Sequence, residues 1–217
     1  MIALPTATSR RPPKPGRPKD LEKRAAILDA AKRLFPTHGF DGVSMDAIAR
    51  DAGVSKLTVY SHFKDKDSLF SEAVRERCAE QLPDELFASP PKGPLRRQLR
   101  SIAGGFFALL MSEESLALHR MLAQQRTDST LARLFWDAGP RRIQEGFAQF
   151  LQTQVDAGAL RIPDTRRAAS QFFSLLKGEM HAQEMFGCCG PLVSRDVEAH
   201  LDATVDFFLR ACAPERC

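Results

Sequence analysis

Residues 44–63 read SMDAIARDAGVSKLTVYSHF and contain the local signals of two short helices joined by a tight turn. Ser44 can cap the first helix, because a serine side chain accepts a hydrogen bond from the free amides of a first helical turn. Gly53 can take the left-handed conformation that a sharp helix exit needs. Ser55 can cap a second helix that runs to about Phe63. The spacing predicts a helix-turn-helix, although pairs of short helices also occur in all-helical folds that bind no nucleic acid.

The second of these helices has two chemically different faces. Val59 and Phe63 are apolar and four residues apart, so we expect them to face the interior of a small domain. The opposite face carries short side chains that can donate hydrogen bonds, namely Lys56, Thr58, Tyr60 and Ser61. Such side chains can contact phosphate oxygens and base edges in a major groove. The structural alternative is that Tyr60 only covers the core of the small domain.

The first 19 residues hold five prolines and five basic residues. Because proline disfavours helix and removes a backbone donor, we expect a flexible basic arm over residues 1–19. Residues 1–66 contain 13 Lys and Arg against 7 Asp and Glu, whereas residues 67–217 contain 18 against 20. A positive charge concentrated at one end indicates a polyanionic partner there, or no more than a solubilising tail.

Apolar residues at three- and four-residue steps predict helices in the rest of the chain. We expect the first helix to end at Pro36 and Gly39, and a fourth helix to begin after Asp65. Further helices are predicted over residues 95–111, 113–126, 129–137, 140–157, 164–186 and 194–211. No segment alternates with a period of two, so we expect an all-α fold. It should divide into a helix-turn-helix domain at 20–66 and a helical domain at 67–217.

Four stretches of the N-terminal third fit one known pattern. They are ILDAA at 27–31, HGF at 38–40, VSMDAIARDAGVS at 43–55 and KLTVYSHFKDKDSL at 56–69. Together they resemble the DNA-binding domain of the TetR/AcrR family of transcriptional regulators over residues 16–74. Leu57 departs from the small residue that the family often has at its position. The resemblance implies a regulator, by preference a repressor, whose partner is double-stranded operator DNA.

The resemblance also implies which residues lie against the DNA. These are Ser44, Ser55, Lys56, Thr58, Tyr60, His62 and Lys64, with Ser44 at a phosphate. The chemistry agrees, because helix N-termini and hydroxyls bind phosphate while lysine and tyrosine donate to backbone oxygens. Ser55 could instead serve only as a cap, and His62 could be a surface histidine. Arg17 and Lys19 resemble the basic extensions of some family members and could enter a minor groove, or supply only nonspecific charge.

The C-terminal part contains LHR at 118–120, LRIPD at 160–164 and FFSLL at 172–176. These stretches resemble the C-terminal domains of AcrR- and AefR-like members, which implies an effector cavity and a homodimer interface. A two-fold dimer would present its two reading helices to major grooves about 34–36 Å apart, or a multiple of that distance. We expect the pairing surface to be Phe172, Leu176, Met180, Val197, Leu201, Val205 and Phe208. These stripes could equally be ordinary core.

Aromatic and methionine side chains are dense in the same domain, and most of them must belong to its core. We expect a cavity for a small apolar or amphipathic effector to be lined by Phe107, Met111, Met121, Gln125, Trp136, Phe147 and Phe173. Polar anchors could come from His119, Arg120 or Gln125. Such an effector would release the DNA by binding more tightly to the conformation that does not fit the operator.

The sequence shows no motif of an enzyme, a cofactor site or a metal site. A phosphate-cradling glycine loop, an HExxH motif and a nucleophile elbow are all absent, so we expect no catalysis and no cofactor. The five cysteines match no disulfide framework. The alternative function is a thiol- or metal-responsive regulator that uses Cys188 and Cys189, although a four-ligand zinc pattern is absent. With no secretion signal and no stretch of about 18 apolar residues, we expect a cytoplasmic protein that does not enter the membrane.

Overall fold

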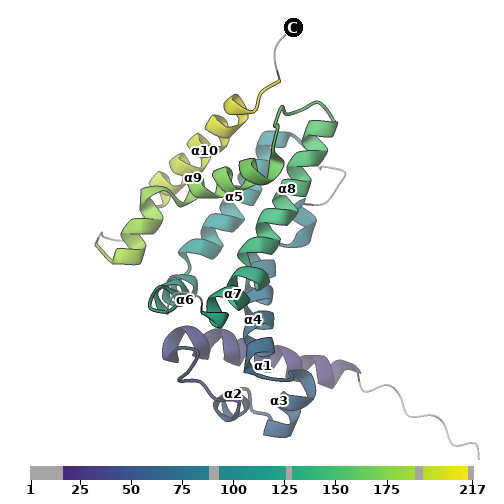
Figure 1. The fold of residues 1–217 in the computed structure, drawn as a ribbon, viewed down its shortest axis with the longest axis vertical. Helices are drawn as coiled ribbons and strands as arrows, with labels where there is room; N and C mark the ends of the chain where they lie inside the picture. Colours follow the sequence, from purple (N-terminus) through teal and green to yellow (C-terminus); the bar gives the residue numbers. More distant parts are fainter. Residues whose placement is uncertain (1–16, 88–92, 126–128, 189–192, 215–217) are drawn as a thin grey trace, which may run out of the picture.

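The computed structural model describes residues 17–87, 93–125, 129–188 and 193–214, and these residues form α-helices and one 3-10 turn but no strand. The all-α fold class expected from the sequence is therefore confirmed. Figure 1 shows the first three helices at one end of the molecule, a larger helical bundle above them, and one helix that runs between the two.

The end domain consists of α1 (Arg17–His38), α2 (Met45–Asp51) and α3 (Lys56–His62), and α4 (Lys66–Gln81) leads away from it. A 3-10 turn, η1 (Asp84–Phe87), precedes the bundle. The bundle contains α5 (Leu95–Met111), α6 (Glu113–Ala123), α7 (Thr130–Ala138), α8 (Pro140–Asp156), α9 (Thr165–Phe186) and α10 (Ser194–Ala211). These six helices begin and end within three residues of the ranges that the sequence predicts.

Side-chain caps fix where the short helices begin. The hydroxyls of Ser44 and Ser55 each accept a hydrogen bond of 3.1 Å from the backbone amide three residues ahead. Asp65 and Ser68 form a reciprocal capping box at the start of α4. Each such cap typically stabilises a helix by about 1 kcal/mol. The turn between α2 and α3 contains Gly53 at φ 65°, the left-handed conformation that the sequence predicted.

The two ends of α1 differ from the prediction. Pro36 does not end the helix, because a proline in the last turn costs only one helical hydrogen bond there. The helix continues to His38, and Gly39 at φ 75° provides the exit. At the other end α1 already begins at Arg17, so it includes the last three residues of the segment assigned to the arm. Residues 1–16 lie outside the described part.

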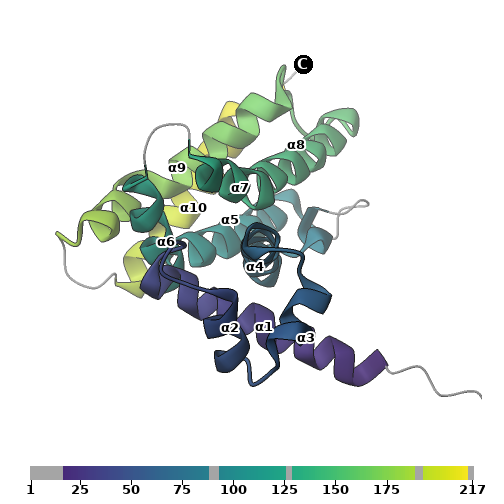
Figure 2. The same cartoon turned by 60° about the horizontal axis from the view of Figure 1, so that its bottom comes forward.

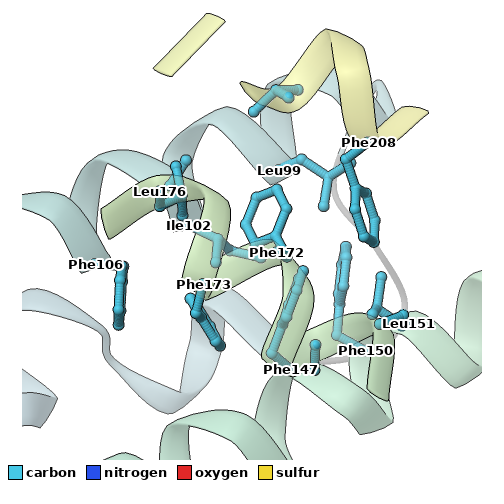
Figure 3. Packing of buried hydrophobic residues seen from close by; sticks show 14 of the residues in the cluster. Leu99, Ile102, Phe106, Phe147, Phe150, Leu151, Phe172, Phe173, Leu176 and Phe208 are labelled. Atoms are coloured by element: carbon cyan, nitrogen blue, oxygen red, sulfur yellow. The ribbon is translucent and has the colours of Figure 1, made fainter. Parts of the chain in front are cut away.

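Two hydrophobic cores are built on one shared helix. The first joins α1, α2 and α3 to Leu69 and Phe70 of α4. The second fills the bundle, where the ring of Phe147 lies 4.9 Å from that of Phe172 and 5.1 Å from that of Phe173 (Figure 3). Cys78, near the end of α4, packs against both cores. The domain boundary expected at residue 66 therefore falls before a helix that belongs to both parts.

Candidate nucleic-acid interface and effector cavity

The outward face of α3 is open to solvent at the end of the molecule, which Figure 2 brings forward. Val59 and Phe63 are buried in the first core, as predicted. On the opposite side, Leu57 is 80% exposed and Tyr60 is 46% exposed. An exposed leucine is the feature that sequence reasoning noted only as a departure from the family pattern. Its position gives α3 an apolar contact point beside the donor of Tyr60.

Lys56 is exposed on the same helix but already has a partner. Its Nζ lies 2.9 Å from an oxygen of Asp46 on α2. The hydrogen bond to Asp46 raises the pKa of Lys56 above its ordinary value, so the side chain remains charged. Thr58 shares a 2.9 Å hydrogen bond with the hydroxyl of Ser55 at the start of α3. A phosphate at this helix start would therefore meet two hydroxyls and one ammonium group.

His62 does not share this outward face, in contrast to the expectation. Its side chain is only 10% exposed and packs toward α1, where its Nε2 lies 3.2 Å from Oδ1 of Asp20. The spacing along α3 explains the difference, because His62 precedes the inward-facing Phe63 and follows Val59 by nearly one turn. Lys64, just after α3, is exposed. Arg17 and Lys19 fall in the first turn of α1, and their side chains lie outside the described residues.

Lys66 has a positioning role that sequence reasoning missed. Its Nζ donates to the carbonyl oxygens of Phe40 (2.8 Å) and Val43 (3.0 Å), and lies 4.3 Å from the centre of the Phe40 ring. These contacts close the loop that leads into Ser44 and α2. Only the folded structure brings Lys66 to this loop, because it lies more than twenty positions after Phe40 and Val43 in the chain.

A cavity of about 280 Å³ lies between α4 and the bundle helices α5 to α9. We call it the α4–α9 cavity. Trp136 and Phe173, two of the seven residues expected to line an effector site, do line it, and so does His119. Its wall also includes Arg77 and Lys177, which sequence reasoning did not select. Both project from helices far apart in sequence, so periodicity alone could not indicate that they share a cavity.

The other five residues expected at the cavity lie elsewhere. Phe107 and Phe147 are buried in the second core, with Phe147 completely inaccessible. Met111 packs against the second core and Met121 against the first. Gln125 follows α6 and does not reach the cavity wall. The sequence pattern did not select the full lining of this cavity, because a dense set of apolar residues marks a core and does not reveal where that core is hollow.

His119 is a polar group on this wall with a strongly perturbed ionisation. Burial lowers its pKa to about 4, and the nearby His181 and Lys177 contribute in the same direction. The His119 imidazole is therefore neutral near pH 7. Arg120, the other basic candidate for an anchor, instead donates to the carbonyl oxygens of Glu184 and Met185 at the end of α9. That contact caps the C-terminal end of α9, and Arg120 does not line the cavity.

The pairing surface expected on α9 and α10 requires a correction. Five of its seven residues, Phe172, Leu176, Leu201, Val205 and Phe208, are buried in the second core of their own subunit. Met180 and Val197 also pack against that core. The exposed apolar side chains of the same two helices are Leu175, Phe186 and Phe207. The stripes read from the sequence were thus core stripes, the alternative that the spacing left open.

The cysteines proposed as an alternative sensor are only partly covered by the structure. Cys188 is exposed and its thiol lies 3.7 Å from the carbonyl oxygen of Gln183, while Cys189 lies outside the described residues. Within the described ranges no three His, Cys, Asp or Glu side chains are grouped as metal ligands.

No single helix in the described ranges is long and apolar enough to cross a membrane. The bent pair α5 and α6 passes the same test of length and composition only when the two helices are taken together.

Comparisons with known proteins agree with this arrangement. Residues 27–73 match the family described as bacterial regulatory proteins, tetR family, and residues 97–214 match the C-terminal domain of AefR-like transcriptional repressors. The chain is 29% identical over 150 residues to the uncharacterized HTH-type transcriptional regulator YdeS of Bacillus subtilis, a match that covers 68% of this chain and 72% of YdeS.

Two solved structures have the same fold. A TetR-family regulator from Mesorhizobium loti superposes with a TM-score of 0.74 at 30% identity, covering 90% of this chain and 99% of that one. The flavonoid-responsive regulator FrrA superposes with a TM-score of 0.69 at 34% identity, covering 89% and 98% of the two chains. The family matches cover both the helix-turn-helix with its exposed α3 and the C-terminal helical domain. This chain therefore belongs to the TetR family of bacterial transcriptional regulators.

Proposed function

We propose that this protein is a homodimeric repressor that leaves its operator DNA when a small apolar or amphipathic molecule fills the α4–α9 cavity. The observation that carries the proposal is the double role of α4. Its first half, with Leu69 and Phe70, belongs to the core that supports α3. Its second half, with Arg77 and Cys78, forms part of the cavity wall.

This arrangement supports a direct mechanical link between ligand and DNA. A molecule that displaces the cavity wall also displaces α4, and α4 cannot move without moving the packed core on which α3 rests. In a dimer such a shift changes the distance between two reading helices that must fit grooves at a fixed spacing. The ligand must then bind the altered spacing more tightly than the operator-bound one. That the similar protein FrrA is named flavonoid-responsive supports a small-molecule effector.

The DNA-contacting set in this proposal is narrower than the sequence suggested. Lys56 and Tyr60 contact phosphate or base edges from the exposed face of α3, and Thr58 contacts phosphate near its N-terminus. The start of α2 at Ser44 and the exposed Lys64 extend the contact along the backbone. We leave His62 out of this set, because its side chain is largely buried and lies 3.2 Å from Asp20 of α1. Arg17 and Lys19 continue the contact at the beginning of α1.

The dimer in this proposal uses the outward faces of α9 and α10, which form one side of the bundle (Figure 1). Phe207 is 53% exposed on α10 and Phe186 is 82% exposed at the end of α9. Exposed apolar side chains on neighbouring helices are typical of a contact surface between subunits. A two-fold axis through this surface would pair each helix with its copy.

The proposal is tested by fluorescence anisotropy with a labelled duplex taken from the DNA upstream of the protein's own coding sequence. We expect two subunits to bind one duplex, with affinity well above that for a scrambled duplex of equal length. Tyr60→Ala should weaken the specific complex, whereas Leu21→Ala, an exposed change on α1, should not. Equal affinity for specific and scrambled duplexes at low ionic strength would reject the function.

A further inference from the structure

The charged side chains that line the α4–α9 cavity are all cationic. Arg77 and Lys177 reach its wall, and no aspartate or glutamate among the described residues does so. Arg77 is already matched, because its guanidinium lies 2.7 Å from Glu114 and 3.4 Å from Glu80. Lys177 has no carboxylate within ion-pair distance among the residues that the structure describes. The cavity wall therefore carries one positive charge, on an exposed side chain, that no carboxylate of the described residues compensates.

Two imidazoles, those of His119 and His181, lie close to the ammonium group of Lys177. The rings of His119 and His181 lie 5.7 Å apart beside Lys177. Burial lowers the pKa of each, and the ammonium of Lys177 lowers both further. Nδ1 of His119 and Nε2 of His181 are buried without a hydrogen-bond partner in the described part of the chain. Burial, the larger cause, disfavours a charge of either sign, whereas the smaller contribution of the Lys177 ammonium disfavours a cation and favours an anion.

The remainder of the wall is largely apolar. Rings of Phe106, Phe135, Trp136 and Phe173 surround the space. A volume of about 280 Å³ is close to the lower end of ligand pockets, which span roughly 300–1,000 Å³. The space suits one compact molecule with an apolar ring or short chain and few polar groups.

We propose that the α4–α9 cavity selects an apolar monoanion, a molecule with a compact hydrophobic body and a single acidic group, and that Lys177 is the residue that binds its charge. This inference rests on the proposed function, since it specifies the chemical class of the effector for the same cavity. An uncharged molecule of equal shape would fill the apolar space but leave the ammonium of Lys177 without a counter-charge. A cationic one would face the same ammonium and be repelled.

The test uses three molecules that share one hydrophobic body: cyclohexylpropanoate, cyclohexylpropanol and cyclohexylpropylamine. None of them absorbs where tryptophan does, and Trp136 on the cavity wall is the only tryptophan of the chain. Its fluorescence therefore reports occupancy of this cavity directly. Isothermal titration calorimetry of the full-length protein gives the affinities.

We expect the carboxylate to bind about tenfold more tightly than the alcohol, the gain typical of one charge-assisted contact. The amine should bind more weakly than either. Lys177→Met keeps the length of the side chain and should reduce the preference for the carboxylate to nearly none, while affinity for the alcohol stays the same. Lys23→Met, an equal loss of charge on the exposed side of α1, should leave all three affinities unchanged.

The inference is overturned if the alcohol binds the parent protein as tightly as the carboxylate, or if Lys177→Met retains the tenfold preference. Operator release is measured separately, by anisotropy with the same carboxylate. If the carboxylate binds through Lys177 but the DNA complex is unaffected, the ligand class stands and the release mechanism fails. If the alcohol releases the DNA as well as the carboxylate does, release stands and the charge preference fails.

Discussion

Lys56 occupies the proposed DNA interface with its charge already shared by Asp46, at 2.9 Å. Both side chains are more than half exposed, so this ion pair contributes little to folding stability. The ion pair instead affects the affinity for DNA, because a phosphate must replace Asp46 as the partner of the Lys56 ammonium group. The carboxylate also places a negative charge beside the nucleic acid, which reduces the gain from that exchange.

We therefore predict opposite effects for the two members of the pair. Lys56→Met should weaken operator binding by about tenfold and reduce the slope of log affinity against log salt concentration by about 1, as expected for one lost phosphate contact. Asp46→Asn should keep or raise the affinity, since it removes the repulsive carboxylate. Anisotropy titrations between low and moderate salt measure both. If Lys56→Met has the same slope of log affinity against log salt concentration as the parent, Lys56 does not contact a phosphate.

His119 predicts a pH dependence of stability with a defined sign. An unfolded histidine titrates near pH 6.5, whereas in the folded protein the pKa of His119 is about 4. Between these values the unfolded chain binds a proton that the folded chain does not. The contribution of His119 to the unfolding free energy is therefore complete above pH 6.5 and is lost as the pH falls toward 4.

The matching variant is His119→Phe, which keeps an aromatic ring beside Phe135, 5.5 Å away in the parent. Between pH 7 and pH 4 the parent should lose on the order of 2 kcal/mol more unfolding free energy than the variant. Urea denaturation at each pH measures the unfolding free energy of both proteins. The titration of the other histidines is common to the two proteins and cancels when their values are subtracted. Parallel curves for the two proteins would contradict the assigned ionisation.

At the scale of an element, α9 is interrupted in its middle. Gly178 has φ 48° and ψ −157°, outside the helical region. The carbonyl of Leu176 next to the break accepts a 2.9 Å hydrogen bond from Nε2 of His200 on α10. A side-chain carbon added at Gly178 would lie 3.0 Å from Cε1 of the same ring. The histidine thus satisfies the backbone where the helix opens and leaves no room for a larger residue.

Gly178→Ala should consequently destabilise the protein by about 2 kcal/mol, because it combines backbone strain with a clash against His200. Gly187→Ala is the matched control, since Gly187 also has a positive φ, 63°, but faces open space. That change should cost about 1 kcal/mol, from the conformation alone. Thermal unfolding should show a melting temperature lower in the first variant than in the second. Equal losses would show that the contact with His200 has no cost.

At the scale of the whole molecule, the proposed dimer depends on exposed side chains that the sequence pattern did not select. Phe207→Glu places a charge in the exposed apolar face of α10 and should convert the proposed dimer to monomers. Operator affinity should fall by at least about a hundredfold, because one reading helix contacts only half of a palindromic site. Analytical ultracentrifugation reports the mass and anisotropy reports the affinity.

The control for this change is Leu21→Glu, which adds the same charge at a 59% exposed leucine of α1. It should leave the mass of the assembly unchanged. If Phe207→Glu remained dimeric, the subunits would have to pair through another surface than α9 and α10.

Sequence by itself determined the helices, their caps and the reading helix of this protein. Ser44, Ser55 and Gly53 act on their immediate backbone, and Val59 and Phe63 mark one face by spacing alone. Such signals are local, so they survive without knowledge of the rest of the fold. Only the tertiary structure decided which apolar stripes are core, where the core is hollow, and that Arg77 and Lys177 share one cavity. Those properties depend on how helices distant in sequence pack together, and a period of three or four residues looks the same whether a stripe meets its own subunit, a partner or a ligand.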